Sequence, residues 1–270
     1  RKQLPQYCID GKARKGCVSG KTGRREIDLT LYSPETKSIL ASRTLKDKQG
    51  EQRVALEILK KEVRNLPRGV FSGDAGIISP AFTGLVILRN CSYILGLKGN
   101  AGDVFNVIEE YNWDNILKKY TLEDKPAHGR REIRTIKTVK IGKIGKKYFE
   151  KYKDAKNIYQ VVADVYDVKE QVWRQNTRYF IGDIKISRWS LPAILTYIRD
   201  HWRIETYHHT KDVSLKEDAC RLKRHNGSRV LGVLRSVAIK LGSRAYSSFQ
   251  EFLDEFSTEP RKTAVYIDSM

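Results

Sequence analysis

The sequence predicts an α/β fold in which three strands come first and helices then alternate with strands. Residues 24–32 and 38–45 alternate apolar and polar side chains, as strands with one buried face do. At 51–66 the apolar side chains change to helical spacing, and Pro67 ends that helix. A chain of 270 residues that is 40% hydrophobic can bury a core of this kind. The change of period indicates a sheet covered by helices.

The order of the elements narrows the fold class. In chain order we expect strands at 7–10, 24–32 and 38–45, a helix at 51–66, a strand that leads to Asp74, a helix from Pro80 to Leu88, and a strand from Tyr93. This order, β-β-β-α-β-α-β, is that of a ribonuclease-H-like mixed sheet flanked by helices. In that topology the ends of the first and fourth strands lie side by side. Asp10 and Asp74 are therefore expected to meet.

A β-rich insertion is expected between Asp74 and the helix that carries Glu205. Lysine- and glycine-rich turns such as K-I-G-K-I-G-K-K join its strands, at 130–141, 158–168 and 177–184. The residues leave two interpretations open, a solvated basic sheet or a platform that faces DNA. The predicted organisation is a first core segment at 1–100, the insertion at 101–189, C-terminal core helices at 190–245 and a tail at 246–270.

The helical period returns at Ser190, a favourable N-cap residue. An apolar stripe follows, which Glu205 is expected to extend, at Leu191, Ile194, Leu195, Ile198 and Trp202. The last helix, at 228–241, is expected to pack in the core through Leu231, Leu234, Val237, Ala238 and Leu241.

Three carboxylates occupy places where an acid is usually unfavourable. Asp10 and Asp74 are expected at the ends of short apolar strands, and Glu205 on an apolar helix face. Burial of three unpaired carboxylates is costly, and a divalent cation is the natural compensation. Each acid alone could equally be a turn or surface residue. Together, in this order and with the charge described next, they favour a metal site for phosphoryl transfer.

The charge balance indicates a polyanionic partner. Against 32 Asp and Glu stand 51 Lys and Arg, and the net charge of +19 exceeds what solubility requires, so nucleic acid is the leading candidate. No apolar run approaches the roughly 20 residues of a membrane span, so no membrane association is expected. Four scattered cysteines without a C-x-x-C pair argue against a disulfide framework or a zinc knuckle and fit a reducing cytoplasm. Because the chain starts at Arg1 without an initiator or a signal peptide, a preceding segment is expected.

Several segments carry a family resemblance. The most specific is R-D-H-W-R-I-E-T-Y-H-H-T-K-D-V-S-L-K-E-D-A-C-R at 199–221, and others are I-D-G-K-A-R-K-G at 9–16, L-K-G-N at 97–100 and H-G-R-R-E-I-R at 128–134. With N-G-S-R-V-L-G-V-L-R-S-V-A-I-K-L in the last helix, the chain resembles the bacterial insertion-sequence transposases of the H-repeat-associated group. These are DDE transposases with a ribonuclease-H-like core, and the resemblance covers nearly the whole chain.

The resemblance implies a catalytic and metal-binding triad of Asp10, Asp74 and Glu205. It implies two Mg²⁺ ions, roughly 3.5 to 4 Å apart, with Mn²⁺ as a substitute. Two departures affect the flanking positions, since Thr206 and His209 stand where the group usually has asparagine and tryptophan. The usual asparagine-glutamate pair after the third strand is also altered, to Gly50-Glu51.

The function expected from these observations is a transposase catalytic domain that cuts element ends and joins them to target DNA. Its partner is double-stranded DNA, which it would bind as a homodimer in the bacterial cytoplasm, at the nucleoid. Phosphate contacts are expected from Lys12, Arg14, Lys98, Arg130, Arg131, Arg199 and His201. Two alternatives stay open. One is a ribonuclease-H-like nuclease without strand transfer, and the other is an inactive DNA-binding remnant.

Overall fold

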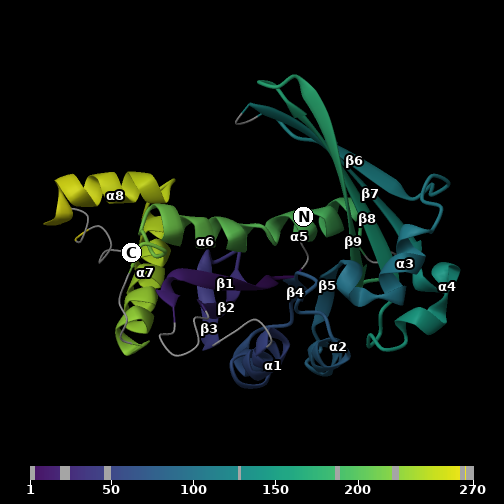
Figure 1. Ribbon diagram of the computed structural model, residues 1–270, viewed down its shortest axis with the longest axis horizontal. Helices are drawn as coiled ribbons and strands as arrows, with labels where there is room; N and C mark the ends of the chain where they lie inside the picture. Colours follow the sequence, from purple (N-terminus) through teal and green to yellow (C-terminus); the bar gives the residue numbers. More distant parts are fainter. Residues whose placement is uncertain are drawn as a thin grey trace. The chain divides into compact units, whose positions relative to one another are not determined.

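The computed structural model describes residues 4–18, 25–45, 50–126, 129–185, 189–220, 225–261 and 265 (Figure 1). The chain divides into two compact units. The first unit comprises Arg1–Gln6 and Leu59–Asp200, and the second comprises Tyr7–Ile58 and His201–Met270. Each unit combines strands with helices, so the predicted α/β class is confirmed.

The order of elements in the first hundred residues follows the prediction. It is β1 (Gln6–Val18), β2 (Arg25–Ser33), β3 (Ser38–Leu45), α1 (Glu51–Lys61), β4 (Val70–Gly73), α2 (Pro80–Leu88) and β5 (Ser92–Leu97). The helix α1 ends earlier than expected, and a short 3-10 turn at Val63–Asn65 follows it. The order β-β-β-α-β-α-β is compatible with a ribonuclease-H-like core.

The first unit is built on a mixed sheet with the strand order β4-β5-β9-β8-β7-β6. Its further strands are β6 (Lys119–Glu123), β7 (Arg130–Lys140), β8 (Asn157–Asp167) and β9 (Val172–Gly182). Strands β4 and β5 are parallel, whereas β9 is antiparallel to β5, with Gly182 opposite Ile94. The three strands predicted in this segment are therefore confirmed, but they continue the sheet of β4 and β5 rather than forming a sheet of their own.

Helices cover both faces of this sheet around β4. Val70 lies in a buried cluster with Ile194 and Ile198 of α5 (Leu191–Asp200). The next residue, Phe71, packs edge-on against Phe82 of α2, with 6.4 Å between ring centroids. Neighbouring residues of one strand thus face different helices, as the period of two requires.

Some helical segments of the first unit have no clear signal in the sequence. These are α3 (Asp103–Glu109), α4 (Ile141–Ile144) and 3-10 turns at Gly99–Ala101 and Lys146–Phe149. The run K-I-G-K-I-G-K-K, predicted to be a turn, instead forms α4 and the 3-10 turn after it. Between them Gly145 adopts a φ of 141°, which favours glycine.

The second unit contains the antiparallel strands β3-β2-β1 with α6 (Arg203–Val213), α7 (His225–Ala245) and α8 (Phe249–Thr258). The expectation that Asp10 ends a short strand is wrong. Strand β1 continues to Val18, and Asp10 lies within it, opposite Thr30 of β2. The strand can continue because its later cations, Lys12 and Arg14, are buried in ion pairs with acids of the same unit.

The expectation that Leu234 and Val237 pack in the core is also wrong. In α7 these side chains are 58% and 48% exposed. The buried side of α7 instead presents Ile239 and several small residues, among them Gly232, which lies against the guanidinium group of Arg14. A helix can approach a strand closely through small residues, so the packing face is not the most apolar one.

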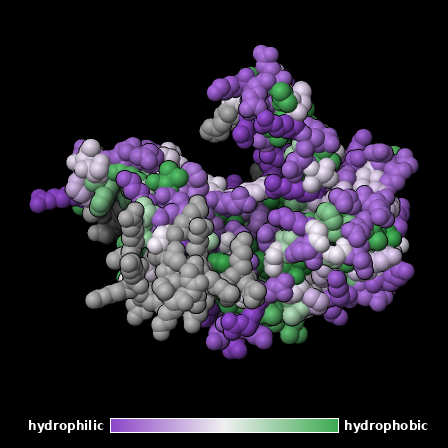
Figure 2. Space-filling model, in the orientation of Figure 1, coloured by the Kyte–Doolittle hydropathy of each residue, from purple (hydrophilic) through white to green (hydrophobic). Residues whose placement is uncertain are grey.

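Hydrophilic side chains cover much of the surface, including most of the projecting ends of the β7–β9 strands (Figure 2). In the described part of the chain, no helix combines the length and apolar character needed to cross a membrane.

Candidate active site

Asp10 lies against the helix that carries Glu205. The Oδ2 atom of Asp10 is 3.5 Å from Nδ1 of His208 in α6, and the two side chains are 23% and 11% exposed. The Nε2 atom of His208 is buried and has no hydrogen-bond partner among the described residues. Glu205 precedes His208 by three residues, about one helical turn. Two residues of the predicted triad are therefore carried by packed elements of the second unit.

The position of Glu205 differs from the prediction. Helix α5 ends at Asp200 and α6 begins at Arg203, so the stripe of the first helix does not continue. The buried side chains of α6 are Ile204, Tyr207, His208 and Lys211. This face starts one residue before Glu205, which is therefore exposed at its edge. The break between α5 and α6 changes which residues face the core. The prediction that the apolar stripe of the first helix continues through Glu205 is therefore wrong.

A buried ionic cluster lies next to Asp10. Lys12, which shares a face of β1 with Asp10, has its Nζ 2.7 Å from Asp212 and 2.9 Å from Glu217. The same ammonium is 3.6 Å from Asp218, and Lys211 also contacts Glu217, at 2.8 Å. These contacts join β1 to the end of α6 and to the segment after it.

The two central groups of this cluster have shifted pKa values. Burial alone would lower the pKa of the Lys12 ammonium, but hydrogen bonds to Asp212 and Glu217 raise it above its ordinary value. Burial alone would raise the pKa of Glu217, but Lys211 and Lys12 together hold it below its ordinary value. Both groups are therefore charged at neutral pH.

Arg14 has a similar position further along β1. Its Nε donates to Asp28 of β2 at 2.6 Å, and its Nη1 is 3.8 Å from Glu26. The cationic groups of Lys12 and Arg14 thus face carboxylates of their own unit. Their expected contacts with phosphate stay a prediction.

Asp74 follows β4 directly, as predicted, and is half-buried. Its Oδ1 accepts a hydrogen bond from the Gly76 N–H at 2.8 Å. The side chain of Asn100 donates from Nδ2 to the Ala75 carbonyl at 2.8 Å and so ties the loop after β5 to the Asp74 loop. Asn100 is the last residue of the L-K-G-N segment, and its contact with the Asp74 loop was not predicted from the sequence.

The remaining predicted DNA contacts differ in their surroundings. Lys98, Arg130 and Arg131 are exposed in the first unit, and Arg131 pairs with Glu123 at 3.2 Å across the surface. Arg199 pairs with Asp124 at 3.0 Å, and His201 is half-buried at the break before α6. Exposed cations such as Lys98 and Arg130 are available to a phosphate backbone.

The acids suit a hard divalent cation in chemistry, because carboxylate oxygens are its preferred ligands. Asp10 is half-buried beside an imidazole, and the second carboxylate oxygen of Asp74 makes no hydrogen bond among the described residues. Over the described ranges, however, no three His, Cys, Asp or Glu side chains gather closely enough to hold a metal ion. The cation site stays a prediction.

Three curated proteins resemble the chain, whereas no family profile matches it. It is 23% identical over 241 residues to "Putative transposase YncI" of Escherichia coli O157:H7. It is 26% identical over 157 residues to "H repeat-associated putative transposase YhhI" of Escherichia coli strain K12. The chain is therefore similar to two proteins named as putative transposases, one of them H-repeat-associated. The resemblance predicted from the sequence motifs is thereby confirmed. "Putative protein YbfL" of strain K12 is 22% identical over 241 residues.

The two longer matches cover most of the chain but only part of the matched proteins. The alignment with YncI includes 86% of the chain and 60% of that protein. The alignment with YbfL includes 86% of the chain and 62% of that protein. The alignment with the H-repeat-associated protein includes 55% of the chain and 40% of that protein. The chain thus spans about three-fifths of the length of two of its relatives.

Proposed function

We propose that this chain is the catalytic domain of a DNA transposase, which cleaves the ends of a mobile element and joins them to target DNA. The observation that carries the proposal is the contact of Asp10 with His208, because it packs the strand of the first acid against the helix of Glu205. The names of two relatives and the position of Asp74, half-buried directly after β4, support the same assignment.

In the proposed site, Asp10, Asp74 and Glu205 would hold two Mg²⁺ ions, which Mn²⁺ could replace. The chemistry that such ions supply is activation of the attacking water or 3′-hydroxyl and neutralisation of charge on the departing 3′-oxygen. The carboxylates themselves form no covalent bond with DNA. His208 would orient Asp10, and the buried Lys12 cluster would fix the strand that carries it.

Both chemical steps fit one set of residues. Hydrolysis of a phosphodiester and attack by the freed 3′-hydroxyl are in-line displacements at phosphorus, so the same oriented groups can serve each in turn. The exposed cations Lys98 and Arg130 would hold the DNA backbone, as would those of the other predicted contacts that are accessible.

The test is cleavage of DNA that carries the two ends of the element encoding this chain, with Mg²⁺. Asp74→Asn should lower the cleavage rate at least about a thousandfold, because the reaction loses a ligand and a charge. Asp103→Asn is the matched control, since Asp103 is an exposed acid of α3 in the same unit. Cleavage by the Asp74 variant at the rate of the control would refute the proposal.

Two further measurements separate the alternatives. A strand-transfer product from a pre-cleaved end with a free 3′-hydroxyl would exclude a nuclease that only cuts. DNA binding without turnover in Mg²⁺ or Mn²⁺ would identify a remnant, an alternative that the exposed position of Glu205 and the altered neighbours Thr206 and His209 favour.

A further inference from the structure

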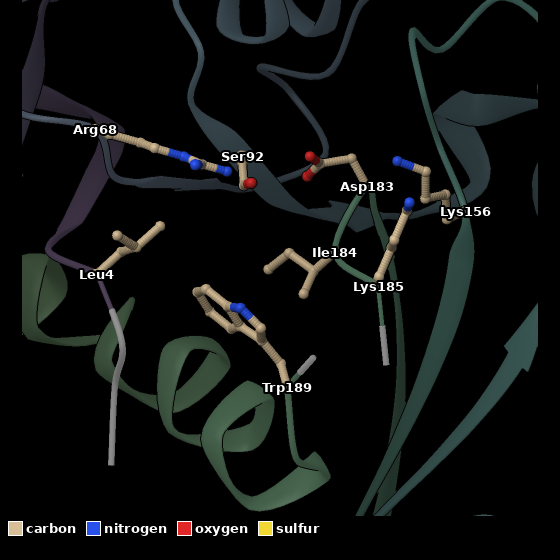
Figure 3. Close-up of a pocket in the computed structure, with 8 residues that line it drawn as sticks. All are labelled: Leu4, Arg68, Ser92, Lys156, Asp183, Ile184, Lys185 and Trp189. Atoms are coloured by element: carbon tan, nitrogen blue, oxygen red, sulfur yellow. The ribbon is translucent and has the colours of Figure 1, made fainter. Parts of the chain in front are cut away.

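A cavity of about 340 Å³ opens in the first unit (Figure 3). Arg68 and Ser92 stand at the start of the parallel strands β4 and β5, whereas Asp74 follows the end of β4. The cavity therefore lies at the N-terminal ends of β4 and β5, whereas the predicted catalytic acid lies at the C-terminal end of β4. It is a separate feature, and an inference about it does not rest on DNA cleavage.

Three cations line this cavity around one carboxylate. Arg68, Lys156 and Lys185 are partly or fully exposed, and their side chains extend toward the space around Asp183 (Figure 3). None of the three forms an ion pair with an acid in the described part of the chain. This differs from Lys12, whose ammonium is held by three acids. The cavity therefore has an excess of positive charge, three cations against one carboxylate, which favours binding of an anion.

The segments that carry these groups are fixed by backbone hydrogen bonds. Lys156 donates its N–H to the Gly182 carbonyl at 2.9 Å, and the Lys185 carbonyl accepts from Trp189 at 3.3 Å. Asp183 is 9% exposed and its Oδ1 accepts the Tyr93 N–H at 2.7 Å. The Asp183 carboxylate is thus held by a hydrogen bond to β5, and the three cations are available to bind a ligand.

The opposite wall is apolar. Leu4, Ile184 and Trp189 line it (Figure 3). Trp189 also stacks on Tyr197, with 5.1 Å between ring centroids. The Ile184 carbonyl accepts from Asn157 Nδ2 at 2.7 Å, which fixes this wall as well. A ligand with an anionic part and a compact apolar part would therefore match both sides. The cavity volume lies at the lower end of the range for small-molecule sites, which excludes a duplex as the occupant.

We propose that this cavity binds a nucleoside phosphate, with the phosphate on Arg68, Lys156 and Lys185 and the nucleoside against the Trp189 wall. The ligand is either a free nucleotide or the phosphorylated end of a single strand, since both present the same chemical group. A phosphate ester is favoured over a carboxylate because three cations surround the space and a dianion interacts with all of them.

Calorimetric titration with deoxyadenosine 5′-monophosphate tests the proposal. Lys156→Gln and Lys185→Gln should each weaken binding at least about fivefold, because each removes a charge from the cavity. Lys143→Gln is the matched control, since Lys143 is an exposed lysine of α4 outside the cavity, and it should leave binding unchanged. Asp183→Asn should tighten binding about threefold or more, because it removes the one opposing charge. Loss of structure alone would not produce that gain.

Several results would overturn the proposal. They are the absence of saturable binding, equal weakening by Lys143→Gln and Lys185→Gln, no gain with Asp183→Asn, or affinity no higher than for inorganic phosphate. A short 5′-phosphorylated oligonucleotide that competes, when its 5′-hydroxyl form does not, supports the proposal and identifies a strand end as the source. Binding of the free nucleotide alone supports a small-molecule ligand. The Asp74→Asn variant should bind as the wild type does, so failure of the cleavage proposal is distinguishable.

Discussion

Lys12 and Glu217 are buried, 9% and 4% exposed, where a single unpaired charge would be unfavourable. Their stability depends on mutual contact and on Asp212 and Lys211. The sequence could indicate that acids follow α6, but the partner of each acid could not be predicted. The pairing joins residues about 200 positions apart, which no local pattern specifies.

The lowered pKa of Glu217 predicts a loss of stability in acid. A carboxyl whose folded pKa is below its unfolded value stabilises the protein above the unfolded value, near 4.5, and this contribution is lost as pH falls through the folded pKa. Glu217→Gln should therefore lower the free energy of unfolding at pH 7 and flatten its decline below about pH 4.5. Urea unfolding from pH 7 to pH 3 measures both effects. Glu109→Gln, at an exposed acid of α3, is the control, and equal pH slopes for the two variants would contradict the assignment.

His208 and His209 form a natural pair for testing the orientation of Asp10. His208 is buried and 3.5 Å from Asp10, whereas His209 is exposed on the same helix. If the site acts as proposed, His208→Gln should slow Mg²⁺-dependent cleavage about ten- to a hundredfold, as loss of a residue that orients a metal ligand does. His209→Gln should leave the rate within about twofold. Circular dichroism would confirm that both variants are folded, and equal rates would show that His208 does not position Asp10.

Among the helices and strands, the sequence pattern predicted those whose position depends on neighbouring residues in the chain. Helix α2 begins where Pro80 and the Ser79 N-cap place it, and Ser79 accepts the Phe82 N–H at 3.2 Å. Strands β2 and β3 also match their apolar alternation. The length of β1 could not be predicted, because its later cations are buried only through acids on other elements. The exposure of Glu205 could not be predicted either. The break between α5 and α6 changes which side chains face the core, and no Gly or Pro in the sequence indicates that break.

Two glycines should respond in opposite directions to the same substitution. At Gly182, at the end of β9, a Cβ atom would lie 2.8 Å from the Tyr93 carbonyl oxygen, where strand pairing leaves no room. At Gly84, within α2, a Cβ atom would meet nothing within 4 Å. Gly182→Ala should cost about 1–3 kcal/mol of unfolding free energy, and Gly84→Ala should add about 0.5–1 kcal/mol. Thermal and urea unfolding test the pair, and stabilisation by Gly182→Ala would show that the contact of β5 with β9 is looser than described.

For the whole molecule, the net charge of +19 overstates the positive charge that is accessible to a polyanion. Several cations are already committed to acids, including Lys12, Arg14 and Arg134, the last with Asp124 and Glu132. Others, such as Lys98 and Arg130, are exposed, and neither has an ion pair in the described part of the chain. The usable charge is therefore a matter of pairing, which composition does not reveal.

This difference predicts which cations set the salt dependence of DNA binding. Each phosphate contact releases counterions and contributes about 0.9 to the slope of log K against log salt. Arg130→Gln and Lys98→Gln should each reduce the slope by about that amount if these side chains contact DNA. Arg134→Gln removes the same charge, yet it should leave the slope unchanged, because that guanidinium faces carboxylates. Fluorescence anisotropy with duplex DNA at about 50 to 200 mM salt measures the slopes. An equal fall for all three variants would show that total charge, rather than exposed unpaired cations, governs the binding.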